Sequence, residues 1–99
     1  MELKLETYGQ IISDDELGKV IANQILLLLK KNDKVVINFE SVISMATYNA
    51  KQIFGELYFE LGSDEFFRRI QFKNVSSNLE YIIRLGIQDS IATREQEYA

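Results

Sequence analysis

The 99-residue sequence predicts an α/β fold: a small mixed sheet of about four strands with three helices, arranged as a two-layer sandwich. Three observations support this. Apolar residues alternate near the start of the chain, apolar residues recur at helical spacing in three later segments, and Val35–Ile37 is apolar at every position. The last pattern is typical of a central strand covered by helices. Since no repeat or linker interrupts the chain, we expect one domain over residues 1–99, with a polar tail at 93–99 that frays.

The first strand is predicted at Glu2–Tyr8, because Leu3 and Leu5 alternate with charged residues. Gly9 and Gln10 could then turn the chain into a short second strand at Ile11-Ile12, which would form a hairpin with the first.

The first helix is expected to begin with a capping box at Ser13-Asp14-Asp15-Glu16, in which the serine and glutamate side chains bind free backbone amides. Its last turn carries Lys30 and Lys31, which complement the negative end of the helix dipole. The apolar stripe between these ends has helical spacing and consists of Leu17, Val20, Ile21, Ile25, Leu28 and Leu29.

A loop from Glu40 to Thr47 follows the central strand and leads into the second helix. Gly62 is a natural stop for this helix, and Gly55 lies inside it at a cost of about 1 kcal/mol relative to alanine. We interpret Gly55 either as a point of close packing against the sheet or as a tolerated surface position. The apolar stripe of the helix consists of Ala50, Ile53, Phe54, Leu57, Tyr58 and Leu61.

The last part of the chain predicts a helical turn at Ser63–Phe66, a strand at Arg69–Lys73 and a third helix. Ser77-Asn78-Leu79-Glu80 repeats the capping-box pattern at the start of that helix. Its apolar stripe consists of Leu79, Ile82, Ile83, Gly86, Ile87 and Ile91.

The composition excludes several classes of function. The chain has no cysteine and no histidine, so disulfide scaffolds, the usual zinc sites and histidine-dependent acid-base catalysis are not expected. The net charge of −4 argues against direct nucleic-acid binding, and the longest apolar run, Ile25–Leu29, is too short to span a bilayer. We therefore expect a cytoplasmic, non-catalytic protein without a metal or cofactor.

Several short segments resemble the STAS fold of anti-sigma-factor antagonists, and in particular small bacterial STAS-like proteins of unassigned function. They are Ile37–Val42, Ile53–Leu57, Leu61-Gly62 and Arg69–Asn74. The similarity extends over about residues 11–90. It implies a regulatory module that binds a protein partner by partner switching, with an anti-sigma-type ATPase or kinase as the partner.

In the STAS switch proteins, the loop that enters the middle helix carries a serine, and phosphorylation of this serine by the partner kinase blocks binding. That serine falls on Tyr48 here, so Thr47 is the nearest hydroxyl that could serve as phosphoacceptor, and Ser44 is the next. The acidic pair of the STAS-like proteins is replaced by Lys51 and Gln52. The resemblance therefore preserves the scaffold and departs from the familiar switch.

The expected partner-binding surface comprises the loop at the start of the second helix and the outward face of that helix: Ser44, Thr47, Tyr48, Lys51, Gln52 and Phe59. Structural roles remain open for several of them. Thr47 could be a helix cap, Tyr48 a partly buried packing residue, and Phe59 an extension of the core stripe. The basic residues Arg68, Arg69 and Lys73 could clamp a phosphate or form a solvated strand face.

We formulate two functional hypotheses and rank an enzyme or nucleotide-binding domain last, because the loop lacks a phosphate-cradling glycine pattern. The first is the regulatory module described above. The alternative is a small acidic inhibitor, of the kind carried by phages or mobile elements, that sequesters a nucleic-acid-handling protein through Asp14-Asp15-Glu16 and Asp64-Glu65. Surplus apolar residues at Leu26, Leu27, Phe59 and Phe66 would also suit a homodimer.

Overall fold

The computed structural model describes residues 1–98, with side chains through Arg94. Its elements follow in chain order; η1 is a 3-10 helix and η2 a π-helical turn. They are β1 (Glu2–Lys4), η1 (Leu5–Tyr8), β2 (Ile11–Ile12), α1 (Leu17–Lys31), β3 (Val35–Asn38), β4 (Ser44–Met45), α2 (Thr47–Ala50), η2 (Lys51–Gly55), α3 (Glu56–Leu61), α4 (Ser63–Arg69), β5 (Ile70–Lys73) and α5 (Ser77–Tyr98).

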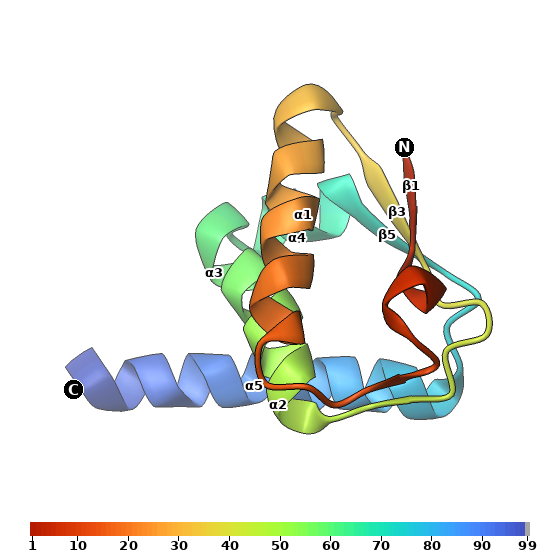
Figure 1. Cartoon of the computed structure of the whole chain (residues 1–99). Coiled ribbons are helices and arrows are strands. Elements are labelled where there is room, and N and C mark those ends of the chain that lie inside the picture. Colours follow the sequence, from red (N-terminus) through yellow and green to blue (C-terminus); the bar gives the residue numbers. More distant parts are fainter. Residues whose placement is uncertain (99) are drawn as a thin grey trace.

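The strands form two parallel sheets, so the prediction of one mixed sheet of about four strands is wrong in this detail. One sheet has the order β1-β3-β5 and the other pairs β2 with β4. Helical crossovers return the chain to the same end of the sheet each time, which makes consecutive strands parallel. Figure 1 shows α1, α3 and α4 on one side of the three-stranded sheet and α5 crossing the lower end of the molecule.

The predicted first strand and hairpin need correction. The strand ends at Lys4, and η1 carries Leu5 fully into the core before Gly9 turns the chain at a φ of 119°. Glycine adopts this conformation without the clash that a Cβ would cause. The chain then enters β2, which pairs in parallel with the distant β4 instead of returning along β1.

Neither predicted capping box forms. At the start of α1, the carboxylate of Asp14 accepts a hydrogen bond of 2.9 Å from the backbone N–H of Glu16, and the helix begins at Leu17. At the start of α5, the hydroxyl of Ser76 accepts a bond of 3.1 Å from the N–H of Leu79. Ser76 therefore caps α5 one residue before the predicted serine. In both cases a neighbouring residue within the same polar cluster supplies the oxygen.

Of the basic residues around β5, Arg68 and Lys73 are exposed, as expected for a solvated face, whereas Arg69 is half-buried. The guanidinium of Arg69 donates to three backbone carbonyls at the end of α1: 2.6 Å to Leu29, 3.2 Å to Asn32 and 2.9 Å to Asp33. Helix C-termini carry free carbonyls and a partial negative charge, which a guanidinium satisfies. Arg69, the last residue of α4, therefore ties the end of α1 to the start of β5. The neighbouring groups form exposed ion pairs, Arg68 with Asp33 and Glu65, and Lys73 with Glu2.

Arg69→Met should lower the free energy of unfolding by about 1.5 kcal/mol, because hydrogen bonds from a charged donor to partly buried carbonyls are lost while the apolar stem is kept. Urea denaturation monitored by circular dichroism measures this. Arg68→Met is the matched control, and it should cost less than about 1 kcal/mol because its ion pairs are exposed. Equal losses in the two variants would contradict a capping role for Arg69.

The second predicted helix is one continuous helical segment, α2–η2–α3, which ends at Gly62 as expected. Gly62 has a φ of 82°. Gly55 is buried where α5 crosses this segment, and a Cβ there would lie 2.6 Å from the Cβ of Ser90. The close-packing interpretation of Gly55 is therefore correct, but its neighbour is α5 rather than the sheet. Gly86 of α5 lies equally close on the other side of the crossing.

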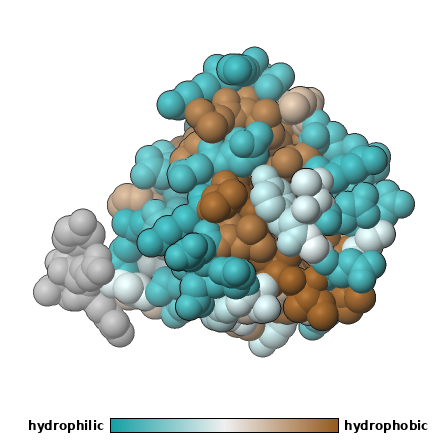
Figure 2. Space-filling model, viewed as in Figure 1, coloured by the Kyte–Doolittle hydropathy of each residue, from teal (hydrophilic) through white to brown (hydrophobic). Residues whose placement is uncertain are grey.

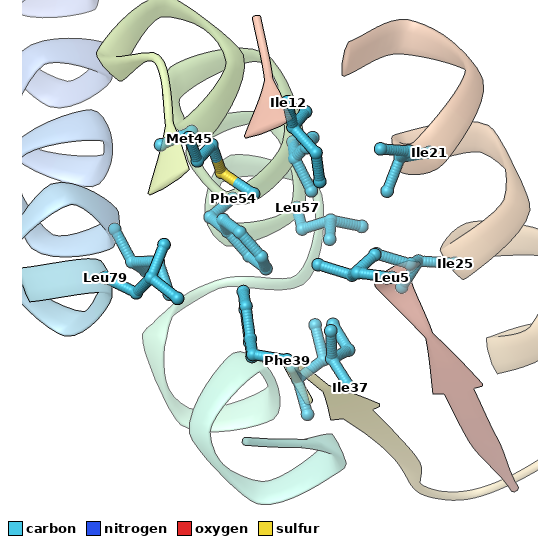
Figure 3. Packing of buried hydrophobic residues seen from close by; sticks show 14 of the residues in the cluster. Leu5, Ile12, Ile21, Ile25, Ile37, Phe39, Met45, Phe54, Leu57 and Leu79 are labelled. Atoms are coloured by element: carbon cyan, nitrogen blue, oxygen red, sulfur yellow. The ribbon is translucent and has the colours of Figure 1, made fainter. Parts of the chain in front are cut away.

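The core is centred on three aromatic rings: Phe39 directly after β3, Phe54 in η2 and Phe72 in β5. The ring of Phe54 lies 6.2 Å from that of Phe39 and 5.6 Å from that of Phe72, between centroids. Figure 3 shows side chains from β3, α1 and α5 converging on Phe54. Phe66, which was expected at a dimer surface, is fully buried in this core and meets its neighbour Phe67 edge to face.

Within the described residues, no helix is long and apolar enough to cross a membrane. The last helix, α5, continues to Tyr98, which extends into the tail that was expected to fray. Residue 99 and the side chains after Arg94 lie outside the described part of the chain.

Candidate functional site

The two strands of the smaller sheet each lead into a helix, β2 toward α1 and β4 toward α2. Ile11 and Ser44 are paired in this sheet, and Ile11 is 62% exposed whereas Ser44 is half-buried. Their following neighbours, Ile12 and Met45, are buried. Figure 2 shows apolar surface at the lower right, over this sheet. Ile11 and Ser44 are more exposed than Ile12 and Met45 because successive side chains of a strand point to opposite faces of the sheet.

Tyr48 lies in the first turn of α2, next to this sheet. Its ring is 43% exposed, and its hydroxyl donates a hydrogen bond to the backbone carbonyl of Ser13. Partial desolvation raises the pKa of the phenol above its ordinary value, and the nearby Asp15 carboxylate raises it further. The contact holds an exposed aromatic ring in one orientation. We name Ile11, Ser44, Thr47 and Tyr48 the entry surface.

Thr47 is the first residue of α2 and is exposed, but it is not the helix cap. That position belongs to Ala46, and no side chain bonds there. The hydroxyl of Thr47 is therefore accessible. Two residues further, buried Asn49 donates a bond of 2.7 Å from Nδ2 to the carbonyl of Asp14, which links α2 to the segment before α1. Asn49 was missed, although an asparagine inside a helix is itself a signal of such a bond.

Lys51 and Gln52 do not form the outward face that was predicted. The Lys51 ammonium lies 3.4 Å from a carboxylate oxygen of Asp89 and 3.0 Å from the hydroxyl of Thr93, both on α5. The Gln52 side chain packs on the other side, against Gly18 of α1, and its Oε1 is buried. Both residues are half-buried because α1 and α5 flank the middle helix. They join three helices rather than offer a free surface.

Phe59 is 53% exposed, so the interpretation that it only widens the core stripe is wrong. The guanidinium of Arg94 lies 3.5 Å from its ring centroid, and the same guanidinium is 2.9 Å from the Glu56 carboxylate. A cation over an aromatic face is a favourable contact. Beside it, a shallow groove of about 430 Å³ runs between α3 and α5 and includes Ile91. We name Phe59, Ile91 and Arg94 the distal patch.

The structure therefore separates the predicted site residues. Ser44, Thr47 and Tyr48 lie together, whereas Phe59 lies at the far end of the same helical segment, about 16 Å along its axis. Ile11, Asn49 and Arg94 were missed. Strand alternation places Ile11 and Ile12 on opposite faces, and in this two-stranded sheet only the face of Ile12 is covered. Arg94 was not predictable, because only the crossing of α5 brings it to Phe59.

Within the described residues, no group of three or more acidic side chains is arranged to hold a metal ion. The carboxylates near the site have local roles. Asp14 binds the Glu16 amide, Glu56 pairs with Arg94, and Asp89 pairs with Lys51. The arrangement offers apolar and aromatic groups in a polar surround, which is the chemistry of protein recognition.

A family model, the STAS-like domain of unknown function DUF4325, matches residues 18–80, which is more than half of the chain. The chain belongs to this STAS-like family. The matched STAS-like segment runs from α1 to the start of α5, so it includes Tyr48 and Phe59 and leaves out Ile11 and Arg94. The predicted resemblance is confirmed. Neither the curated proteins nor the solved structures include a significant match to the chain.

Proposed function

We propose that this STAS-like chain is a non-catalytic regulatory module of the cytoplasm that binds a protein partner through its entry surface. The observation that carries the proposal is Tyr48, an exposed ring whose hydroxyl is already held by the Ser13 carbonyl. An aromatic side chain fixed before binding loses little conformational entropy in the complex, and tyrosine is enriched among residues that dominate binding energy. Exposed Ile11, on the strand position paired with Ser44, supplies further apolar surface.

Residue chemistry supports a binding role over catalysis. The chain has no histidine or cysteine that could act as nucleophile or proton carrier near neutral pH. The carboxylates closest to the entry surface are Asp14 and Asp15, and Asp14 is engaged by a backbone amide. With these groups, holding a partner is a better supported role than transforming a substrate.

The partner we propose is an anti-sigma-type ATPase or kinase, on the basis of the resemblance to the STAS switch proteins. Thr47 is the hydroxyl that such a kinase could reach, since it is exposed and free of a capping bond. A phosphate at the first residue of a helix would interact favourably with the free backbone amides there. The same phosphate would add about two negative charges beside Tyr48, which would change the entry surface.

Tyr48→Ala should weaken binding to an anti-sigma-type ATPase from the same genome by about tenfold or more, as measured by isothermal titration of the purified proteins. Tyr81→Ala is the matched control, because it removes an equally large and more exposed ring, on α5, that is not one of the entry-surface residues. It should leave affinity unchanged. Equal affinity of the Tyr48 variant and the wild type would refute the surface, and no binding by the wild type would refute the partner class.

The acidic-inhibitor alternative has less support. Asp14 and Glu16 are joined by a hydrogen bond that shapes the start of α1, and Glu65 pairs with Arg68 at 2.8 Å. That pairing lowers the pKa of the Glu65 carboxyl. These clusters therefore have structural roles in the chain itself. An acidic inhibitor would also bind its target much more weakly at high salt, whereas binding through Tyr48 and Ile11 would change little.

A further inference from the structure

One edge of the three-stranded sheet is open. The order β1-β3-β5 makes β5 an edge strand, and within residues 1–98 no other strand pairs with its outer side. The N–H of Phe39 binds the carbonyl of Lys73, so Lys73 and Gln71 face β3. Backbone groups alternate in direction along a strand. The N–H and the carbonyl of Phe72 therefore both point to the open edge, where a further strand could bind them.

An apolar groove of about 490 Å³ lies beside this edge, between β5, α4 and α5. Ile70 and Phe72 line it from the strand, and Ile83 and Ile87 line it from α5. At its rim, Phe67 is 66% exposed, the highest value among the large apolar side chains of the described residues. An exposed phenylalanine next to an apolar groove and an unpaired strand is typical of an interaction surface.

This surface is complementary to itself. It contains both a protruding apolar ring, Phe67, and a groove that could accept one. Glu80 and Arg84 beside the groove pair with each other at 3.4 Å, so they add no net charge to the surface, and Phe72 offers both a backbone donor and a backbone acceptor. A two-fold axis brings identical surfaces together, so such an interface must hold both halves of every contact.

We propose that the chain forms a homodimer in which β5 pairs antiparallel with β5 of a second copy. The two Phe72 residues would exchange N–H to carbonyl hydrogen bonds across the axis, and the two sheets would join into one of six strands. Phe67 of each copy would cover apolar surface in the groove of the other. This surface differs from the homodimer surface predicted from sequence: Phe66 is buried, and Phe67 is the exposed phenylalanine of the pair.

Sedimentation velocity of the full chain over a concentration series tests the proposal. We expect the mass to rise from 11.5 kDa toward twice that value. Phe67→Glu should weaken dimerisation by about tenfold or more, because it places two like charges in the apolar interface. Phe59→Glu is the matched control, since it introduces the same charge at the other exposed phenylalanine, outside this surface. It should leave the dimer intact.

Amide hydrogen exchange of the wild type provides an independent measurement that requires no variant. The Phe72 amide should gain protection as protein concentration rises, because its N–H is free in the monomer and bound in the dimer. A mass that stays at 11.5 kDa throughout overturns the proposal. So does a dimer that Phe59→Glu weakens as much as Phe67→Glu, or one in which the Phe72 amide stays unprotected.

Discussion

Phe54→Ala is expected to lower the free energy of unfolding by about 3–5 kcal/mol. The Phe54 side chain is fully buried, and its ring lies within 6.2 Å of both Phe39 and Phe72, between centroids. Removing it would leave a cavity where the sheet, α1 and α5 meet (Figure 3). Small domains have total stabilities of about 5–15 kcal/mol, so the loss would be a large fraction of the whole. Urea denaturation at fixed protein concentration measures it.

Phe59→Ala is the control for this prediction. It deletes the same ring from the same helical segment, at a position that is 53% exposed and contacts Arg94. We expect a loss below about 1 kcal/mol, since a single exposed cation–π contact contributes about that much. If the two variants lost equal stability, the core would not be centred on Phe54. If Phe54→Ala lost little, the surrounding side chains would have collapsed into the space.

The elements that the sequence predicts best are those whose signal is local. The apolar spacing of α1, the apolar run of β3 and the glycine that ends α3 all reflect the residues of one segment and their periodicity. Periodicity also identifies the core side of each helix, and Phe54 and Leu57 are buried as expected. The resemblance to STAS proteins adds the expected order of helices and strands along the chain.

Strand pairing and the outward faces of helices were less predictable, because they depend on segments far apart in the chain. Nothing in Ile11-Ile12 indicates that β2 pairs with Ser44–Met45 rather than with β1. Lys51 and Gln52 lie off the apolar stripe, so the spacing correctly predicts that they do not belong to the hydrophobic core. Periodicity cannot reveal that α5 packs on one side of the middle helix and α1 on the other. There α5 contacts the Lys51 side chain and α1 contacts the Gln52 side chain.

The candidate site shows the same limit. Tyr48 was singled out because it aligns with the phosphorylated serine of the STAS switch proteins that the sequence resembles, and its side chain is 43% exposed. The bond that orients its ring comes from Ser13, whose backbone carbonyl has no sequence signature. Arg94 was overlooked since the tail from residue 93 was expected to fray, whereas α5 continues and places its guanidinium over Phe59.

Gly86→Ala should lower the free energy of unfolding by about 3 kcal/mol. A Cβ at this position would lie 2.6 Å from the Lys51 nitrogen and 2.7 Å from the Ala50 carbonyl carbon. Both are backbone atoms, so no rotamer change relieves the overlap. Helix propensity alone would favour alanine by about 1 kcal/mol, so a measured loss of stability would report the steric overlap where the two helices cross. Gln88→Ala, on an exposed position of the same helix, should change stability little.

Gly55→Ala provides the sharper comparison, because there the nearest obstacle is the Ser90 side chain, at 2.6 Å. Adding Ser90→Gly should therefore restore most of the stability that Gly55→Ala loses, whereas the same addition should not rescue Gly86→Ala. Double-mutant cycles of urea denaturation measure both couplings. If Ser90→Gly rescued both variants equally, the helices could move apart at little cost. The crossing would then not be what holds α5, and with it Arg94, in place beside α3.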